Sequence, residues 1–287
     1  MTNVTILGTG AMGSRMATKL LEANHAVTVF NRTKKHALQL IDNGATFAAT
    51  PLEAVKHADV VISMLTNDEA SKSVWLEKNY GAINGLKQNC ITIESSTLSI
   101  TWINQLSKEM DQRNIEFLDA PVIGSRPQAE AGGLIFLVGG NETTLNESKN
   151  VLTSMASSIH HIGPNGSGTQ MKLAVNAFFG VQVSALSEII GLMDKTGIDK
   201  EKTISLFNQL PTTSLALQGI GNLIASNNYN PLFPITLVEK DFRYVTEMAR
   251  YSNALLTVTN AAHTTYKTAI EDNLGGHNIA GVVQLYL

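Results

Sequence analysis

The sequence predicts an α/β protein in which an N-terminal doubly wound, mostly parallel sheet is followed by an all-helical domain. Up to about residue 164, short runs rich in β-branched residues alternate with segments of helical periodicity, as in strand–helix–strand units. Beyond His161 this alternation stops, and helix-compatible sequence continues to about Asn273. A helix-compatible segment, Ser167–Lys195, joins the two parts. We therefore expect two domains, residues 1–164 and 165–287, connected by a long helix.

The length and composition fit two ordinary folded domains. The chain has 287 residues, of which 44% are hydrophobic and 16% are charged, whereas a typical globular domain is roughly 25% charged. This low share of charge indicates a large buried core or a hidden subunit interface, and it excludes a disordered chain. The net charge of −3 argues against a general nucleic-acid-binding surface.

The cysteines, the histidines and the first residues narrow the class of protein further. Cys90 is the single cysteine, which excludes an internal disulfide framework and a cysteine-rich zinc site. His160 and His161 are adjacent, so in a strand they face opposite sides, and no histidine spacing indicates a metal site. Residues 1–7 lack the pattern of a signal peptide, and no apolar stretch reaches the roughly 20 residues of a membrane helix. We expect a soluble, cytoplasmic protein with no membrane or nucleic-acid partner.

The elements of the first domain follow from local patterns. We expect strands at Val4–Leu7, Ala26–Phe30, Asp59–Leu65, Cys90–Ile93 and Glu116–Leu118, and helices after Met12, from Lys34 to Gly44, and over residues 100–113 and 142–156. A further helix start is predicted at Thr50. There the threonine can cap the helix, Pro51 suits its first turn, and Glu53 can reach back to the cap amide.

The glycine-rich pattern G-x-G-x-x-G occupies residues 8–13. It follows a predicted strand directly and opens a predicted helix, which is the context of a Rossmann-type dinucleotide site. Gly8 permits the tight turn, Gly10 lets the pyrophosphate approach the backbone, and Gly13 allows close packing of helix and strand. The pyrophosphate would bind unpaired amides at the positive end of the helix dipole. We therefore assign the following residues to the cofactor site: Gly8, Thr9, Gly10, Ala11, Met12 and Gly13.

The residues after the second strand predict NADP rather than NAD. An NAD site usually places Asp or Glu there, about 20 residues after the glycine loop, but here the sequence is Asn31-Arg32-Thr33. Arg32 can pair with a 2′-phosphate, and Asn31 and Thr33 can supply neutral hydrogen bonds. The alternative is that Arg32 is a solvated loop cation and Thr33 a helix cap. We expect NADP, with NADPH preferred over NADH.

Lys172 and Asn176 stand four residues apart in the long helix, so both project from one side of it. No charged residue lies between Lys172 and Glu188, but polar residues interrupt the apolar sequence, which indicates a helix buried in protein rather than in a membrane. Burying an unpaired ammonium is costly. Lys172 is therefore either a first-turn lysine with its head in water or a proton donor beside a hydride acceptor.

Four separated motifs give the whole chain a resemblance to a known family. They are residues 8–13; Asp119-Ala120-Pro121-Val122 with Gly132-Gly133-Leu134 and Val138-Gly139-Gly140; Gly166-x-Gly168-x-x-x-Lys172-x-x-x-Asn176; and Phe233-Pro234 with Lys240-Asp241. In this order they resemble the β-hydroxyacid dehydrogenase family. That family includes 3-hydroxyisobutyrate dehydrogenase, tartronate semialdehyde reductase and glyoxylate/succinic semialdehyde reductase.

The resemblance implies a role for each motif. Lys172 would be the essential acid/base, because an ammonium in hydrogen-bond reach stabilises the negative charge that grows on oxygen as hydride arrives. Asn176 would orient the substrate oxygen or carboxylate. The resemblance also implies dimerisation through the helical half, cofactor contacts from Met64, Leu65, Thr66, Thr97 and Lys240, and substrate contacts from Ser96, Phe233 and Asp241. Without the resemblance, Ser96 and Thr97 fit a hydroxyl-rich loop that precedes the next helix nearly as well. The alternatives for Lys240 and Phe233 are a surface lysine and a core aromatic.

Position 123 departs from the family pattern. The family generally has Ser-Gly after Pro-Val, and that serine helps to hold the substrate carboxylate, whereas here Ile123, Gly124 and Ser125 follow. Ile123 cannot donate a side-chain hydrogen bond, although the backbone amides of Gly124 and Ser125 can, and Ser125 or Arg126 could compensate. We assign residues 123–125 to substrate binding, and both a small hydroxyacid or semialdehyde and a more apolar substrate stay open.

The sequence thus predicts an NADP(H)-dependent oxidoreductase that transfers hydride between the nicotinamide and a small β-hydroxyacid, semialdehyde or 2-oxo acid. It is expected to act as a homodimer without a metal. Two alternatives stay open. One is an imine reductase-like enzyme, against which Lys172 argues because such enzymes generally replace this lysine. The other is a non-catalytic NADP-binding regulatory protein.

Overall fold

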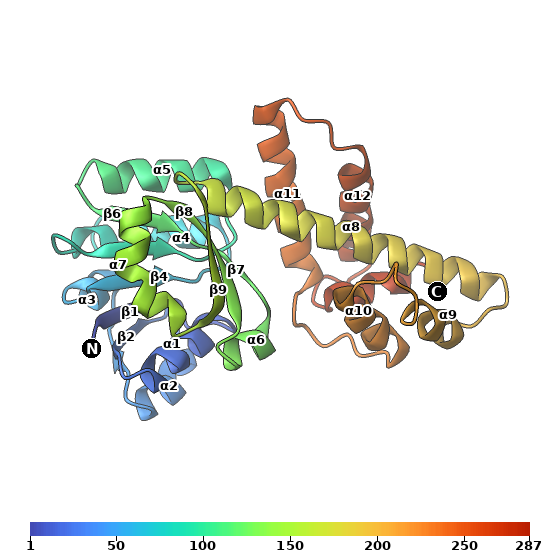
Figure 1. Ribbon diagram of the computed structural model, residues 1–287, viewed down its shortest axis with the longest axis horizontal. Coiled ribbons are helices and arrows are strands. Elements are labelled where there is room, and N and C mark those ends of the chain that lie inside the picture. The colour runs from blue at the N-terminus through green and yellow to red at the C-terminus, as the bar shows by residue number, and fades with distance from the viewer. The chain divides into compact units, whose positions relative to one another are not determined.

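The N-terminal part of the chain folds into the sheet that the sequence predicts. The computed structural model describes residues 1–287 and divides into two compact units, Met1–Lys172 and Leu173–Leu287. In the first unit the strands follow the order β3-β2-β1-β4-β5-β6-β8-β7, with β9 paired to β8. This unit is the blue to green part of the ribbon (Figure 1). The pairings from β3 to β6 are all parallel. The strands are β1 Asn3–Leu7, β2 Ala26–Phe30, β3 Thr46–Phe47, β4 Val60–Ser63, β5 Ile91–Glu94, β6 Glu116–Asp119, β7 Val122–Ile123, β8 Leu134–Gly140 and β9 Ala156–Gly163.

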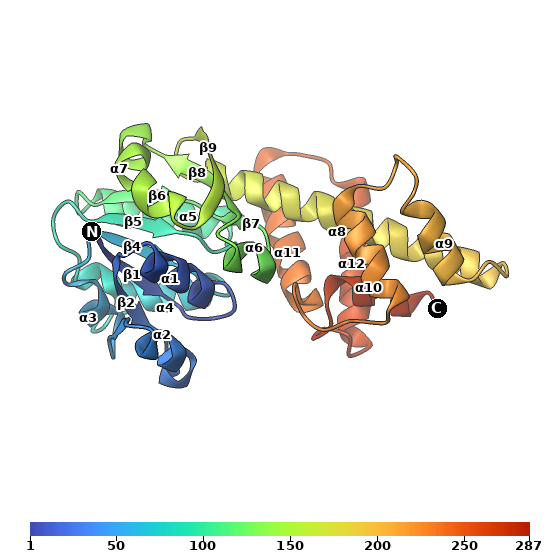
Figure 2. The same cartoon turned by 60° about the horizontal axis from the view of Figure 1, so that its bottom comes forward.

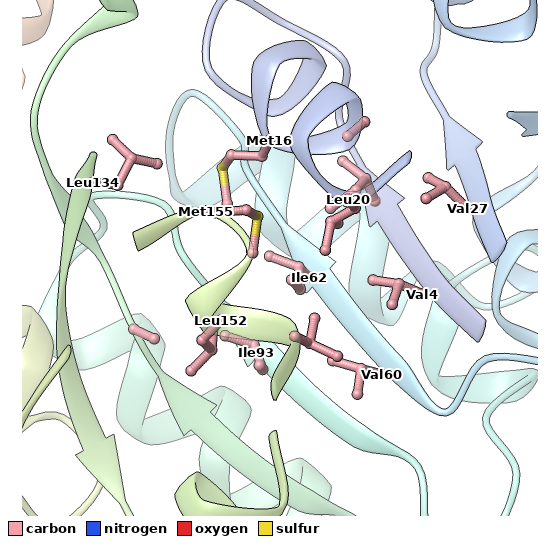
Figure 3. Close-up of a cluster of buried hydrophobic side chains, with 14 of the residues drawn as sticks. Val4, Met16, Leu20, Val27, Val60, Ile62, Ile93, Leu134, Leu152 and Met155 are labelled. Carbon is pink, nitrogen blue, oxygen red and sulfur yellow. The ribbon is translucent and has the colours of Figure 1, made fainter. Parts of the chain in front are cut away.

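Helices cover both faces of this sheet, which confirms the predicted doubly wound architecture. On one face, Met16 of α1 and Leu152 of α7 pack with Ile62 of β4 (Figure 3). On the other face, Trp75 of α4 and Trp102 of α5 belong to a second buried cluster. The helices of this unit are α1 Gly13–Glu22, α2 Leu38–Asp42, α3 Pro51–Val55, α4 Asp68–Leu76, α5 Ile100–Asp111, α6 Arg126–Glu130 and α7 Glu142–Thr153, with short 3₁₀ turns η1 Lys34–Ala37 and η2 Ala82–Asn84.

Some local details of the first unit differ from the sequence prediction. Strand β8 runs antiparallel to β6 and β7. Helix α7 ends at Thr153 and not at the predicted residue 156, because Ala156 begins strand β9. The predicted cap at Thr50 forms, because its hydroxyl accepts a hydrogen bond from the Glu53 amide at 3.1 Å. The Glu53 carboxylate, however, accepts from the amide of Ala49 at 3.2 Å, one residue before the expected cap amide.

The second unit is all-helical, as predicted. Gly180, which interrupts the apolar sequence of α8, allows close packing: a Cβ there would lie 2.5 Å from Cε2 of Phe242. The Tyr266 hydroxyl donates to the Gly180 carbonyl oxygen at 2.8 Å, so α8, α11 and α12 meet around this residue (Figure 2). The helices are α8 Ser167–Lys195, which begins in the first unit, α9 Lys200–Phe207, α10 Leu215–Ala225, α11 Ile235–Ser252 and α12 Thr257–Glu271, followed by the 3₁₀ turn η3 Ile279–Leu285.

Helix α8 has the predicted bounds, Ser167 and Lys195. By length and composition alone it could cross a membrane, since its most apolar window has a mean hydropathy of 1.5. In the structure 50% of this apolar stretch is buried inside the protein, and core helices of soluble proteins can be equally long and apolar. The division between the two packing units falls at Lys172, inside α8. The predicted domain boundary between residues 164 and 165 stays a prediction.

Candidate functional site

The order of the sheet reverses between β1 and β4, and the glycine-rich loop lies at this point. In doubly wound sheets, ligands bind at such a reversal, outside the carboxyl ends of the strands. Gly8 follows β1 with φ +102°, and its amide donates to the carbonyl oxygen of Phe30 at 2.8 Å. A Cβ on Gly8 would lie 2.5 Å from the carbonyl oxygen of Met64, which follows β4. The loop therefore fits between both neighbouring strands only because residue 8 is glycine.

The other two glycines of the pattern have different surroundings. Gly13 begins α1, and a Cβ there would overlap the carbonyl oxygen of Gly8, so packing accounts for this glycine. A Cβ on Gly10 would meet no atom within 4 Å. Packing within the protein therefore does not account for Gly10, whereas the close approach of a ligand does.

The N-terminus of α1 has no side-chain acceptor of its own. Its N-cap residue, Met12, makes no side-chain capping bond, and the first turn contains no acidic residue. Four other helices of the same unit have a side-chain cap, with Thr50 capping α3, Asn67 capping α4, Ser99 capping α5 and Asn141 capping α7. The amides at the start of α1, together with the open space at Gly10, fit an external anion such as the pyrophosphate of a dinucleotide.

Asn31 braces the glycine-rich loop from the end of β2. The amide of Thr9 donates to Oδ1 of Asn31 at 3.2 Å, and Nδ2 of Asn31 donates to the carbonyl oxygen of Thr33 at 3.0 Å. Arg32 and Thr33 are exposed. The Asn31 side chain, which was predicted to hydrogen-bond the cofactor, thus makes its hydrogen bonds within the protein. Arg32 is the charged residue that directly follows it.

Ser96 joins the loops that follow β4 and β5. The amide of Leu65 donates to Oγ of Ser96 at 2.7 Å, and this Oγ donates to Oε1 of Glu94 at 2.5 Å. Ser96 is 1% exposed, whereas Thr97, which follows it, is half-buried. With its one proton directed to Glu94, the Ser96 hydroxyl has no proton left for a substrate. In this arrangement it positions the segment Met64–Thr66.

Glu94 ends β5 as a buried carboxylate that is held by hydrogen bonds rather than by a cation. Its Oε2 accepts from Oγ of Ser71 at 2.7 Å and from Nε1 of Trp75 at 2.9 Å. Its Oε1 accepts from the amide of Ser96 at 3.0 Å, in addition to the Ser96 hydroxyl. A buried charge is costly unless such donors surround it. The network therefore fixes residues 95–97 against α4.

Asp119 ends β6, next to Glu94 in the sheet register, and holds the N-terminus of α8. Its Oδ1 accepts from the amide of Gly166 and its Oδ2 from the amide of Thr169, both at 2.7 Å. Burial raises the pKa of the Asp119 carboxyl to about 6, although these two amides oppose the shift. Lys172 lies one helical turn after Thr169. Asp119 therefore fixes the part of α8 that carries Lys172.

Three predicted site residues form one polar chain in the second unit. Nδ2 of Asn176 donates to Oδ2 of Asp241 at 2.6 Å, and Oδ1 of Asp241 lies 3.2 Å from Nζ of Lys240. Lys240 and Asp241 are buried, and Nζ of Lys240 also lies 5.1 Å from the centroid of the Tyr244 ring. Asp241 thus orients Asn176 and leaves the carbonyl oxygen of that amide for a ligand. Phe233 is half-buried before α11 and is not part of this chain of contacts.

The remaining predicted residues lie in the first unit. Lys172 is 9% exposed and sits in the second turn of α8. Ile123 pairs with Ile135 of β8 and is half-buried, and Gly124 is exposed with φ +122°. The amide of Ser125 donates to the side chain of Gln128 at 2.9 Å. The backbone amides of Gly124 and Ser125 were predicted to hydrogen-bond a substrate, but that of Ser125 already donates to Gln128.

Sequence reasoning gave no positioning role to Glu94, and it named Asp119 only as part of a family motif. Each is the acidic last residue of a strand, at the edge where doubly wound sheets bind ligands, and this placement was the available signal. The histidines form no cluster with other ligating side chains, and no group of three or more His, Cys, Asp or Glu residues could hold a metal ion. His161 instead contacts the carbonyl oxygen of Gly140 at 2.8 Å.

Two family models together match nearly the whole chain. Residues 3–163 match the model described as the NAD binding domain of 6-phosphogluconate dehydrogenase. Residues 166–286 match the model described as NAD-binding of NADP-dependent 3-hydroxyisobutyrate dehydrogenase.

Individual proteins show the same similarity over the full length. The chain is 30% identical to mitochondrial 3-hydroxyisobutyrate dehydrogenase of Drosophila melanogaster, with 99% of this chain and 89% of the relative covered. It is also 30% identical to chloroplastic glyoxylate/succinic semialdehyde reductase 2 of Arabidopsis thaliana, over 98% of this chain and 78% of the relative. Among solved structures, 3-hydroxyisobutyrate dehydrogenase of Mycobacterium tuberculosis with L-serine superimposes with a TM-score of 0.90 at 27% identity, and 99% of each chain is covered.

The contrast between Gly10 and Gly13 can be tested directly. Gly10→Ala should leave the free energy of unfolding within about 0.5 kcal/mol of wild type, because its Cβ faces open space. It should weaken dinucleotide binding at least about tenfold, because the pyrophosphate can no longer approach the backbone. Gly13→Ala is the matched control and should destabilise the fold by about 1–3 kcal/mol through overpacking. Urea unfolding and fluorescence titration with NADPH measure both effects, and wild-type NADPH affinity in Gly10→Ala would contradict the assignment.

The raised pKa of Asp119 predicts a pH-dependent contribution to stability. A carboxyl whose pKa rises from 3.8 to about 6 on folding stabilises the folded state below pH 3.8, and this contribution is lost as the pH rises through 6. The free energy of unfolding of wild type, relative to Asp119→Asn, should therefore fall by about 2 kcal/mol between pH 3.8 and pH 6. Urea unfolding of both proteins at several pH values checks this. A difference that does not change with pH would show that the Asp119 pKa is not raised.

Proposed function

The chain belongs to the β-hydroxyacid dehydrogenase family of NAD(P)-binding oxidoreductases, and from this premise we propose that it transfers hydride between NADP(H) and a small β-hydroxyacid, semialdehyde or 2-oxo acid. The observation that carries this proposal is Lys172, buried in the second turn of α8 and four residues before Asn176. No second candidate function has an equivalent observation. The presence of Lys172 argues against an imine reductase-like enzyme. The relatives also include cytokine-like nuclear factor N-PAC of Homo sapiens, 26% identical over 99% of this chain, so the buried Lys172, and not family membership, favours an enzyme over a non-catalytic regulator.

Lys172 acts as the general acid/base of the proposed reaction. The bound nicotinamide supplies the hydride in the reductive direction. As negative charge develops on the carbonyl oxygen, the Lys172 ammonium stabilises it and donates a proton to that oxygen. In the oxidative direction the neutral amine of Lys172 takes the proton from the substrate alcohol. Asp119 supports this role by fixing the preceding turn of α8.

Asn176 orients the substrate in this proposal. Because one proton of its Nδ2 is already donated to Asp241, the amide plane of Asn176 is fixed, and the second Nδ2 proton can be donated to the substrate oxygen or carboxylate. The ion pair between Asp241 and Lys240 holds the carboxylate in place. Lys240 is further proposed to contact the cofactor, and Phe233 to line the substrate pocket, as the family resemblance implies.

The choice of NADP over NAD rests on the end of β2. No carboxylate stands among residues 31–33 to repel a 2′-phosphate, and the exposed Arg32 can pair with one. Asn31 holds this loop against Thr9, so the position of Arg32 relative to the glycine-rich loop is constrained. These features support a preference for NADPH.

We also propose that the protein is a homodimer that associates through its helical half. Large apolar side chains are exposed there, including Phe178 at 69% and Leu215 at 84%. Exposed apolar surface of this kind is typical of an interaction site. The expected cytoplasmic location stays a prediction.

Replacing Lys172 tests the proposed activity. Lys172→Ala should lower kcat at least about 100-fold, because general acid catalysis is lost, while the Kd for NADPH should change less than about twofold. Lys195→Ala, at the exposed end of the same helix, is the control and should leave both values unchanged. Activity is measured as NADPH consumption with glyoxylate, succinic, methylmalonate and tartronate semialdehydes, and cyclic imines. Rapid turnover of imines with inert carbonyl acids, or no turnover by wild type, would contradict the proposal.

Replacing Arg32 tests the choice of cofactor. Arg32→Asp should raise the KM for NADPH on the order of 100-fold, because a carboxylate beside the 2′-phosphate replaces its cation. The KM for NADH, which lacks that phosphate, should change much less. Lys78→Asp makes the same change of charge on an exposed residue of another loop and serves as the control. Equal increases in KM for the two dinucleotides in Arg32→Asp would refute the NADP assignment.

A further inference from the structure

We propose that Arg126 binds the carboxylate of the substrate and supplies the contact that Ile123 cannot make. This inference rests on the proposed function and decides between the two kinds of substrate that Ile123 leaves open. An anionic aldehyde or keto acid is then the substrate class, and a purely apolar molecule is not.

The segment that precedes Arg126 has few donors to offer a ligand. Ile123 carries none in its side chain. The amide of Ser125 is already hydrogen-bonded to the side chain of Gln128 at 2.9 Å. Gly124 is exposed with φ +122°, and a Cβ there would lie 3.0 Å from both Gln128 and Leu134. Arg126 begins α6 directly after this turn, three residues beyond Ile123.

Arg126 is a cation without an anion. Its place at the start of α6 puts Glu130 four residues further along, where an ion pair would be ordinary on a helix. Glu130 instead pairs with Arg15 of α1 at 2.7 Å. No acidic side chain lies within ion-pair distance of Arg126. Its charge is therefore not neutralised within the protein.

Part of the Arg126 guanidinium is also buried without an acceptor. Its Nε has less than 1 Å² of accessible surface and makes no hydrogen bond. Leaving a buried donor unpaired costs about 1–3 kcal/mol, and more when the group is charged. Such a group is explained when a ligand brings the missing acceptor. A carboxylate fits best, because its two oxygens can accept from the planar guanidinium in parallel.

The test compares free acids with their neutral esters. Succinic semialdehyde and glyoxylate are assayed with saturating NADPH against their methyl esters, in wild type, Arg126→Gln and Arg126→Lys. Arg126→Gln should raise the KM for both acids at least about tenfold while kcat changes less than about threefold, because ground-state binding of the carboxylate is lost. The KM values for the esters and for NADPH should stay within about twofold, and Arg126→Lys should lie between wild type and Arg126→Gln. Arg113→Gln, which removes an exposed arginine paired with Glu109, is the control and should behave as wild type.

Binding is measured in parallel, so that the inference does not depend on turnover. Calorimetric titration of the NADP⁺-saturated protein with 3-hydroxypropionate should show binding that Arg126→Gln weakens at least about tenfold, whereas 1,3-propanediol should bind both proteins equally. Equal affinities of wild type and Arg126→Gln for 3-hydroxypropionate, or no binding by wild type, would overturn the role of Arg126.

Failure of this inference differs from failure of the proposed function. If no carbonyl compound is reduced with either dinucleotide, the proposed function is wrong, and the calorimetry alone decides the role of Arg126. If carbonyl compounds are reduced but Arg126→Gln affects acids and esters equally, the enzyme is as proposed and Arg126 does not bind the carboxylate. An increase in the KM for NADPH alone would overturn the inference by assigning Arg126 to a phosphate of the dinucleotide.

Discussion

The attachment of α8 to the sheet through Asp119 is the constraint on which the candidate site depends. A carboxylate at the positive end of a helix is stabilised by the dipole and by the free amides of the first turn. Here that carboxylate is the last residue of a buried strand, so it fixes the helix to the sheet. Gly139 and Gly168 make room for the contact, since a Cβ on Gly139 would overlap the carboxylate and one on Gly168 would lie 2.7 Å from the Asp119 carbonyl oxygen.

Glu94 and Asp119 solve the same physical problem on neighbouring strands. Both are fully buried and lie side by side in the sheet register, and neither has an ion-pair partner. An isolated buried carboxylate costs several kcal/mol, which only well-placed donors can offset. Glu94 obtains them from α4 and its own following loop, and Asp119 obtains them from α8. These hydrogen bonds hold two segments in place. Glu94 holds the loop that contains Ser96 and Thr97, and Asp119 holds the start of α8, which carries Lys172.

The elements that local sequence determines were predictable, and the contacts between distant residues were not. The bounds of α8 follow from an unbroken helix-compatible segment, and the glycine-rich loop follows from the spacing that a dinucleotide requires. The antiparallel pairing of β7 with β8 could not be foreseen, because β7 has only two residues, too few for a pattern. Ser96 was predicted to contact the substrate, but its hydroxyl bonds Glu94 and Leu65, and no sequence signal shows which donor a buried carboxylate will select.

The two residues proposed to act in catalysis lie on one continuous helix. Lys172 closes the first unit and Asn176 lies in the second, yet both belong to the same helix. Four residues of α-helix advance about 6 Å along the axis and return to nearly the same side. Their mutual geometry is therefore set by the helix itself. Asp119 anchors this helix from the first unit and Asp241 orients Asn176 within the second, so each unit contributes one carboxylate that positions a neighbour rather than reacting.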